Sequence, residues 1–463
     1  MNSTISTLMF KKNIISLLTI AGLGAIWLLA LKTKNATHSQ IPVIANQTPV
    51  SDPITKKSIS RPFSAATKNM DGVNSPQDNK APKRSASLMA KSDSDNDAND
   101  YATLKNRLLK KGIYFGTYLN NDDVLQAPPR SPNYLNTISK YFNLYSIPAW
   151  FHHTEYSGRG IFNFSGPDEV ANYAVKQGAK IHAHNLVWNT MLPPWLAKGT
   201  FTPDELSDIM KTHIQTVVRH YRDKYPGAIL AWDVVNEPIA DPYTPAENVG
   251  PTGLRKTVWS SIHLPGSTDP SDYIKLAFQW AHEADPNVKL YLNEGGIEYN
   301  SHKWQVLYTL VKKLKATGTP IDGIGFQCHF DTHYDHPFSE LLSNMNSLNA
   351  LGLKAQVTEL DCVISTSTVL PWTASAVASP GISDFDKQAQ IFKGTLRACI
   401  LAKNCNAVIV FGAFDPTTSA NRSWKGKNGK YVGPFYPNIL DDNMKPKKAF
   451  KSMMSEASTL IAH

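Results

Sequence analysis

The feature that most constrains the fold is an eightfold alternation of short apolar runs and longer amphipathic stretches from residue 101 onwards. The apolar runs have the length and composition of buried parallel strands. They are expected as strands over 113–118, 142–146, 180–188, 228–237, 288–294, 323–329, 354–361 and 407–415. Helical patterns lie between them, including 204–225, 272–284, 303–317 and 384–403. This α/β alternation predicts a (β/α)8 TIM barrel.

A helix start signal supports the first of these helices. Thr202 stands at the cap, Pro203 occupies the first turn and Glu205 follows three residues after the cap. This order is typical of a capping box. A doubly wound open sheet is the alternative fold, but no Gly-rich phosphate-binding fingerprint follows the first expected strand.

The N-terminal hundred residues differ from the rest of the chain. Residues 14–31 form an uncharged apolar run preceded by two lysines, which is typical of an export signal. The run is long enough for either a cleaved signal peptide or an uncleaved signal anchor, so residues 1–31 are assigned to one or the other. Residues 32–100 have the composition of a disordered linker. Residues 101–463 are then an extracytoplasmic domain, secreted or anchored to the membrane by 14–31.

Charge and cysteine content exclude several classes of protein. Residues 1–100 hold 12 Lys/Arg and 7 Asp/Glu, and 35 Lys/Arg and 31 Asp/Glu remain in 101–463. A basic tail beside a nearly neutral body is not the pattern of a nucleic-acid-binding domain. Four cysteines without a C-x-x-C pair exclude a disulfide-dense small scaffold and offer no zinc motif.

Polar residues gather where the expected strands end, which is where barrel enzymes carry their catalytic groups. They are His182, His184, Trp188, Asn236, Glu237, Gln327, His329, Glu359, Asp361 and Asp415. Glu237 and Glu359 end the fourth and seventh strands, so they face each other across the barrel mouth. Retaining glycoside hydrolases need two carboxyl groups about 5–5.5 Å apart. With tryptophan nearby, the pattern indicates a sugar-cleaving site.

Several motifs resemble one family. The sequence reads HNLVW over 184–188, WDVVNEP over 232–238, GIGFQCH over 323–329, QVTELD over 356–361 and KPKKAF over 445–450. From about residue 113 to 450 the chain is similar to glycoside hydrolase family 10, whose usual members are endo-β-1,4-xylanases. The resemblance implies a retaining endo-β-1,4-glycanase that cleaves xylan or a related plant polysaccharide by double displacement.

The resemblance also implies roles for the catalytic residues. Glu237 is the expected acid/base and Glu359 the nucleophile. His329 is expected to bond Glu359, with Asp361 holding the His329 ring, and Asn236 is expected to bind the sugar 2-hydroxyl. Further substrate contacts are expected from His184, Trp188, Gln327 and Trp424.

Other expectations concern cysteines and partners. The resemblance, together with export, implies a disulfide between Cys399 and Cys405, while Cys328 and Cys362 are expected to be free. No cofactor or metal is expected. The expected partner is a polysaccharide or oligosaccharide, with no nucleic acid, and with membrane contact only through the N-terminal segment of a monomer.

The sugar-binding side departs from the family pattern. The family's T-P-E-N-E-M-K-W is replaced over 146–153, its H-S-Q over 189–191, its N-D-Y-N over 293–296, and its Trp before Gly412 by Phe411. Lost hydrogen bonds to sugar hydroxyls cost on the order of 1–3 kcal/mol each. Aryl glycosides are therefore expected to be cleaved and polymeric xylan to be cleaved poorly, unless a nearby loop replaces the lost contacts.

Two alternatives from other classes remain. A metallohydrolase barrel would use His182 and His184 with the cluster His329, His333 and His336, but gives the two carboxylate motifs no role. A carbohydrate-binding protein without activity would keep both glutamates beside an altered sugar site.

Overall fold

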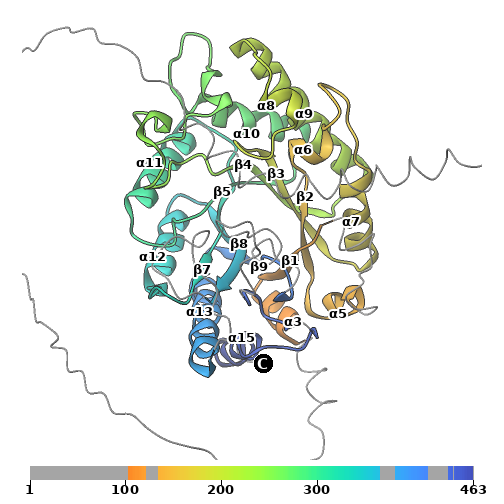
Figure 1. Ribbon diagram of the computed structural model, residues 1–463, viewed down its shortest axis with the longest axis vertical. Coiled ribbons are helices and arrows are strands. Elements are labelled where there is room, and N and C mark those ends of the chain that lie inside the picture. The colour runs from red at the N-terminus through yellow and green to blue at the C-terminus, as the bar shows by residue number, and fades with distance from the viewer. Residues whose placement is uncertain (1–102, 121–133, 365–380, 416–435, 442, 462–463) are drawn as a thin grey trace, which may run out of the picture. The chain divides into compact units, whose positions relative to one another are not determined.

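Parallel strands at the centre of the structure close into a barrel, with helices outside them (Figure 1). The computed structural model describes residues 103–120, 134–364, 381–415, 436–441 and 443–461. The expected export segment and linker, 1–31 and 32–100, lie outside the described residues. Among the described helices, none has the length and apolar character needed to cross a membrane.

The sheet is parallel throughout and closed. Its strands are β1 (Tyr114–Tyr118), β2 (Leu144–Pro148), β3 (Lys180–Val187), β4 (Ile229–Asn236), β5 (Lys289–Glu294), β6 (Gly323–Phe326), β7 (His329–Asp331), β8 (Lys354–Val363) and β9 (Cys405–Val410). Neighbours follow the order β6-β5-β4-β3-β2-β1-β9-β8-β7, and an additional β6–β8 pairing closes the ring. Because β6 and β7 both pair with β8, they share one position in the barrel. The predicted eight-stranded barrel is confirmed.

The expected strand over 323–329 is interrupted. Gln327 donates its backbone N–H to the Glu294 carbonyl (3.0 Å), and the Cys328 N–H donates to the Glu298 carboxylate (2.8 Å). Cys328 has a φ of 60°, in the left-handed region. The chain therefore turns between β6 and β7, and the polar side chain of Gln327 is released from the regular strand.

The last expected strand is shorter than predicted. It ends at Val410 rather than at Asp415, because Gly412 has a φ of 98° and its N–H bonds the Val410 carbonyl (2.9 Å). Only glycine adopts this φ without steric cost. The turn carries the following residues away from the sheet.

The helices surround the barrel (Figure 1). They are α3 (Thr103–Lys110), α5 (Tyr134–Tyr141), α6 (Phe151–Thr154), α7 (Ser165–Lys176), α8 (Pro194–Ala197), α9 (Pro203–Lys224), η2 (Ala246–Asn248), η3 (Val258–Ser261), α10 (Asp272–Ala284), α11 (His302–Ala316), α12 (Phe338–Asn349), α13 (Ile382–Leu401) and α15 (Lys448–Leu460). The four helices anticipated from the sequence begin and end within two residues of their expected bounds.

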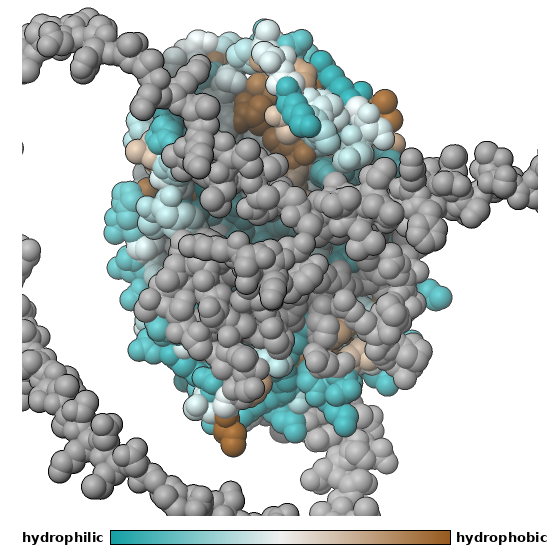
Figure 2. Space-filling model, viewed as in Figure 1, coloured by the Kyte–Doolittle hydropathy of each residue, from teal (hydrophilic) through white to brown (hydrophobic). Residues whose placement is uncertain are grey.

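The capping box of α9 is confirmed. Thr202 Oγ1 accepts the Glu205 N–H (3.2 Å), and Glu205 Oε2 accepts the Thr202 N–H (2.8 Å). The helix then buries one face, which includes Leu206, Ile209 and Val217. Most apolar side chains are buried in this way between strands and helices, while hydrophilic residues cover most of the described surface visible in Figure 2.

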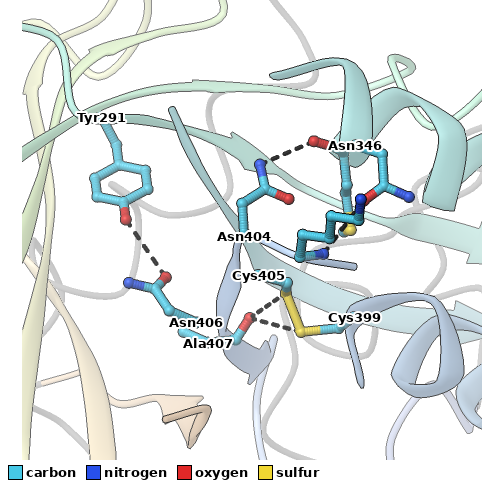
Figure 3. Close-up of a disulfide and its surroundings, with 9 residues drawn as sticks. Tyr291, Asn346, Cys399, Asn404, Cys405, Asn406 and Ala407 are labelled. Atoms are coloured by element: carbon cyan, nitrogen blue, oxygen red, sulfur yellow. Dashed lines mark hydrogen bonds between the residues drawn. A yellow bond between two sulfur atoms is a disulfide. The ribbon is translucent and has the colours of Figure 1, made fainter. Parts of the chain in front are cut away.

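A disulfide joins the end of α13 to the start of β9, as expected. Cys399 and Cys405 are bonded, and their sulfur atoms lie beside the Ala407 carbonyl (Figure 3). Asn404 completes the turn by donating to the carbonyls of Met345 and Leu353 (2.8 Å each). Cys328 and Cys362 are free and buried, also as expected.

Removing this disulfide should lower the free energy of unfolding by about 2 kcal/mol, because a cross-link over a short loop restricts the unfolded chain. Urea unfolding of the double variant Cys399→Ala/Cys405→Ala measures the effect. Cys362→Ala is the control, since it removes a buried sulfur without a cross-link. Dithiothreitol should destabilise the wild type and this control but not the double variant. Equal sensitivity of all three proteins would contradict the prediction.

Candidate active site

Glu237 and Glu359 lie at the same end of the barrel and are joined through side-chain amides. Asn293, at the end of β5, donates to Asn236 Oδ1 (2.9 Å) and to Glu359 Oε1 (2.7 Å). Thr358 donates to Asn293 Oδ1 (2.7 Å), which fixes the amide so that its nitrogen faces both partners. Side chains from the ends of β4 and β5 and from the middle of β8 therefore meet in one hydrogen-bonded group.

Three neutral donors surround the carboxyl group of Glu237. Trp188 Nε1 donates to its Oε2 (3.1 Å), and Gln327 Nε2 donates to its Oε1 (3.0 Å). Asn236 Nδ2 lies 3.4 Å from the same Oε1. Glu237 is half-buried and its φ is 53°. The structure thus places three of the expected site residues around this carboxyl.

Gly295 makes room for the Gln327 side chain. A Cβ atom at Gly295 would lie 2.4 Å from Gln327 Oε1, so no larger residue fits there while Gln327 reaches Glu237. Gly295 belongs to the altered 293–296 motif. This change in the sequence therefore acts directly on a contact of the candidate acid/base.

A histidine and a second carboxyl hold Glu359. His329 Nε2 lies 3.2 Å from Glu359 Oε2, and His329 Nδ1 lies 3.0 Å from Asp361 Oδ1. Burial opposes ionisation of Glu359, but the hydrogen bonds from His329 and Asn293 and the nearby His184 outweigh it and lower its pKa. Glu359 is thus held in its ionised form.

The pKa of His329 is shifted in the opposite direction. Its partial burial opposes protonation, but the carboxylates of Asp361 and Glu359 outweigh this and raise its pKa well above the usual range. The ring of Phe411 lies edge-on to it, with centroids 5.3 Å apart. Phe411, which replaces the family's tryptophan, therefore lies next to His329, the residue that bonds the candidate nucleophile Glu359.

His182 and His184 share a carboxylate. His182 Nε2 and His184 Nδ1 each lie 2.8 Å from Asp233 Oδ2. Burial raises the pKa of Asp233, but the two histidines outweigh it and bring the pKa to about 2. His336 instead bonds the Asp331 carbonyl (2.8 Å) and Tyr299. Within the described part of the chain, no three His, Cys, Asp or Glu side chains are grouped to hold a metal ion.

An aromatic wall lies beside Glu237, formed by Trp150, His153, His184 and Trp188. The Trp150 ring centroid is 4.8 Å from His153, 5.8 Å from Trp188 and 6.1 Å from His184. The His152 N–H donates to the Met191 carbonyl (3.1 Å), which joins the altered segments 146–153 and 189–191. Both departures from the family pattern therefore lie at this wall.

The histidines of the altered segment are neutral near pH 7. Burial lowers the pKa of His153 to about 4, with His152 adding to the shift, and burial also lowers the pKa of His152. Where the family pattern has a lysine near position 152, this chain therefore presents an uncharged ring. The ring of His153 therefore adds area to the aromatic wall without a positive charge.

Two expected residues stand apart from this group. Trp424 lies outside the described residues. Asp415 bonds Lys447 Nζ (3.1 Å) and accepts the Asn438 N–H (2.9 Å), which ties the C-terminal segment to the barrel. Sequence reasoning did not select Asn293 or Asp233 as site residues. Asn293 lies near the end of β5 and Asp233 lies inside β4, and both belong to motifs already singled out for other reasons.

The raised pKa of His329 leads to a testable prediction about Asp361. Asp361→Asn should lower the His329 pKa toward its ordinary value of about 6.5, measured by NMR of the ring. Asp168→Asn is the control, because Asp168 bonds another histidine, His220 (2.8 Å), elsewhere in the barrel. An unchanged His329 pKa in Asp361→Asn would contradict the assignment.

The same shift carries a stability consequence. Because the pKa of His329 is raised in the folded protein, its contribution is fully present below the unfolded-state pKa of about 6.5. The contribution is lost as the pH rises through the folded-state pKa. The free energy of unfolding should therefore change less with pH in Asp361→Asn over that range.

Comparisons with known proteins agree on one family. Residues 103–456 match the sequence pattern of glycosyl hydrolase family 10. Endo-1,4-beta-xylanase C of Phanerodontia chrysosporium is 32% identical over 342 residues, which cover 74% of this chain and 75% of that protein. Xylanase 10B of Thermotoga petrophila, solved with xylobiose, superposes with a TM-score of 0.65 at 26% identity, over 77% of this chain and 98% of that one.

A further solved relative is an intracellular xylanase of Thermoanaerobacterium saccharolyticum, in complex with xylotriose. It superposes with a TM-score of 0.60 at 28% identity and covers 75% of this chain and 96% of that one. The family pattern spans the whole described barrel and includes both candidate carboxyls. The chain belongs to glycosyl hydrolase family 10.

Proposed function

We propose that this chain is a retaining endo-β-1,4-xylanase, a monomer with Glu237 as acid/base and Glu359 as nucleophile. The observation that carries the proposal is the hydrogen-bonded link Glu237–Gln327–Asn236–Asn293–Glu359 at the barrel mouth. It holds two carboxyl groups from different strands in one rigid group. Relatives whose names and complexes indicate xylan and xylo-oligosaccharides support the substrate class.

The first step forms a glycosyl-enzyme. Glu359 is ionised because its pKa is lowered, so an oxygen of its carboxylate attacks the anomeric carbon. The bond from that carbon to the glycosidic oxygen breaks, and Glu237 donates its proton to the leaving oxygen. Trp188 and Gln327 hold Glu237 in place during the transfer.

The second step releases the sugar. Glu237, now a carboxylate, takes a proton from water while the water oxygen attacks the anomeric carbon. The ester bond to Glu359 breaks and its carboxylate returns to the hydrogen bonds of His329 and Asn293. Two displacements at one carbon leave its configuration retained. Asn236, which Asn293 holds beside Glu237, is the residue proposed to bond the sugar 2-hydroxyl in both steps.

The stereochemical outcome tests the proposal. NMR of the first products from xylohexaose should show the β-anomer, and Glu359→Ala should abolish turnover. Glu237→Ala should lose about 10²–10⁴-fold in kcat/KM on xylohexaose, the usual contribution of a general acid. Lys289→Met, at the opposite end of β5, is the control and should retain activity. First products of inverted configuration would refute the retaining assignment.

The same assays address the altered glycone side. The aromatic wall replaces polar contacts, so aryl xylosides should be cleaved well and polymeric xylan poorly. The comparison is kcat/KM on xylohexaose against a family member with the intact motifs. Values within about threefold would show that other contacts replace the lost ones.

We also propose that residues 1–31 are an export signal or membrane anchor. Residues 32–100 are then a linker between this segment and the barrel domain. Support comes from the uncharged run 14–31 behind two lysines and from the polar composition of 32–100. Fractionation of cells that express the full chain should place the activity outside the cytoplasm, and deletion of 1–31 should return it to the cytoplasm. Identical fractionation of the two proteins would contradict this proposal.

A further inference from the structure

Four charged side chains beside Glu237 have no part in the mechanism above. They are Asp241, Arg255, Glu294 and Lys303, here called the charged clamp. Lys303 Nζ lies 2.6 Å from Asp241 Oδ1 and 2.9 Å from Glu294 Oε1, and Arg255 pairs with Asp241. Their side chains are only 0–17% exposed. Two cations and two carboxylates thus form one buried chain of ion pairs.

The charged clamp holds the backbone that follows β4. Arg255 Nε donates to the Glu237 carbonyl (3.1 Å), and the Arg255 N–H donates to the Pro238 carbonyl (2.8 Å). Glu294 Oε2 accepts the Ile239 N–H (2.9 Å). Two consecutive peptide groups, 237–238 and 238–239, are therefore fixed by two members of the clamp. From the opposite side, the Glu237 N–H bonds the Asn293 carbonyl (2.9 Å).

Glu237 needs this support because its backbone is strained. Its φ of 53° lies in the left-handed region, which costs a non-glycine residue on the order of 1–3 kcal/mol. Such a conformation persists only where the surroundings over-determine it. Since φ sets the direction of the Cα–Cβ bond, the contacts of Arg255 and Glu294 also determine where the carboxyl of Glu237 points.

Burying four charges is costly unless each is paired. Burial raises the pKa of Glu294 to about 7, and Lys303 is the cation that opposes this shift. Lys303 also holds Asp241, which in turn orients the Arg255 guanidinium. Arg255 and Glu294 come from separate elements, so Lys303 of α11 is the link that makes them act on Glu237 together.

We propose that the charged clamp positions the proton donor: it fixes the backbone of Glu237 so that its carboxyl stays at the leaving oxygen. The inference rests on the proposed function. Arg255, Asp241, Glu294 and Lys303 are positioning residues here, because they act through the backbone of Glu237.

Leaving-group dependence tests this inference. The value of kcat/KM reports steps up to the departure of the first leaving group, and a dinitrophenolate departs without a proton. Arg255→Met and Lys303→Met should therefore lose about 10²-fold in kcat/KM on xylohexaose but less than about threefold on a dinitrophenyl xylobioside. Intermediate aryl xylobiosides should fall between these limits in the order of their leaving-group pKa.

Arg255→Lys is the conservative variant, and it keeps the test decisive should Arg255→Met fail to fold. It retains the charge but not the guanidinium geometry, so its loss of kcat/KM on xylohexaose should be smaller than that of Arg255→Met. That loss should still exceed its loss of kcat/KM on the dinitrophenyl substrate. Lys289→Met is the matched control, because Lys289 starts the same strand as Glu294 and pairs with Asp322 (3.0 Å) away from the site. It should leave all kcat/KM values unchanged.

A loss equal on every substrate, in variants that keep the wild-type circular dichroism spectrum, would overturn the inference and assign the clamp to stability alone. An unchanged leaving-group dependence in Arg255→Lys and Lys303→Met would also overturn it. Failure of the wild type to cleave any of these xylosides would instead refute the proposed function.

Discussion

The pairing of β8 with both β6 and β9 is the constraint on which the rest of the structure depends. It closes the parallel sheet into a ring, so the carboxyl ends of all its strands meet around one mouth. Glu359 of β8 and Glu237 after β4 can be linked by Asn293 only because the ring is closed. In an open sheet the ends of β6 and β8 would be edges, and the amide link across β4, β5 and β8 would be lost.

The environments of the two carboxyls differ in one physical respect. Glu359 faces a protonated histidine and an amide donor, which favour its ionised form. Glu237 receives hydrogen bonds from the neutral side chains of Trp188 and Gln327, and the cation Arg255 bonds its backbone carbonyl rather than its carboxyl. Two glutamates can therefore take different roles because one has a cationic partner at its carboxyl and the other does not.

Much of the barrel and the centre of the site could be predicted from the sequence, since strand periodicity and short motifs are local signals. The break at Gln327 and Cys328 could not, because it depends on Glu294 and Glu298 of another segment. Asn293 was not predicted as a site residue for the same reason, because the two side chains that accept its hydrogen bonds come from other strands. The charged clamp likewise joins side chains up to 62 positions apart, and it reaches Glu237 through a backbone carbonyl that no side-chain pattern records.

Two of the altered segments and the two candidate carboxyls lie on different strands of the barrel. Segment 146–153 spans the end of β2, segment 189–191 follows β3, and the two meet through the bond from His152 to Met191. Glu237 instead follows β4, and Glu359 lies within β8. Trp188 is one contact between the two parts, because its ring packs against Trp150 while its Nε1 bonds Glu237. Changes at Trp150 can therefore reach Glu237 through the Trp188 ring. A substitution at Trp150 should act on sugar binding first, and on proton transfer only as far as it moves the Trp188 ring.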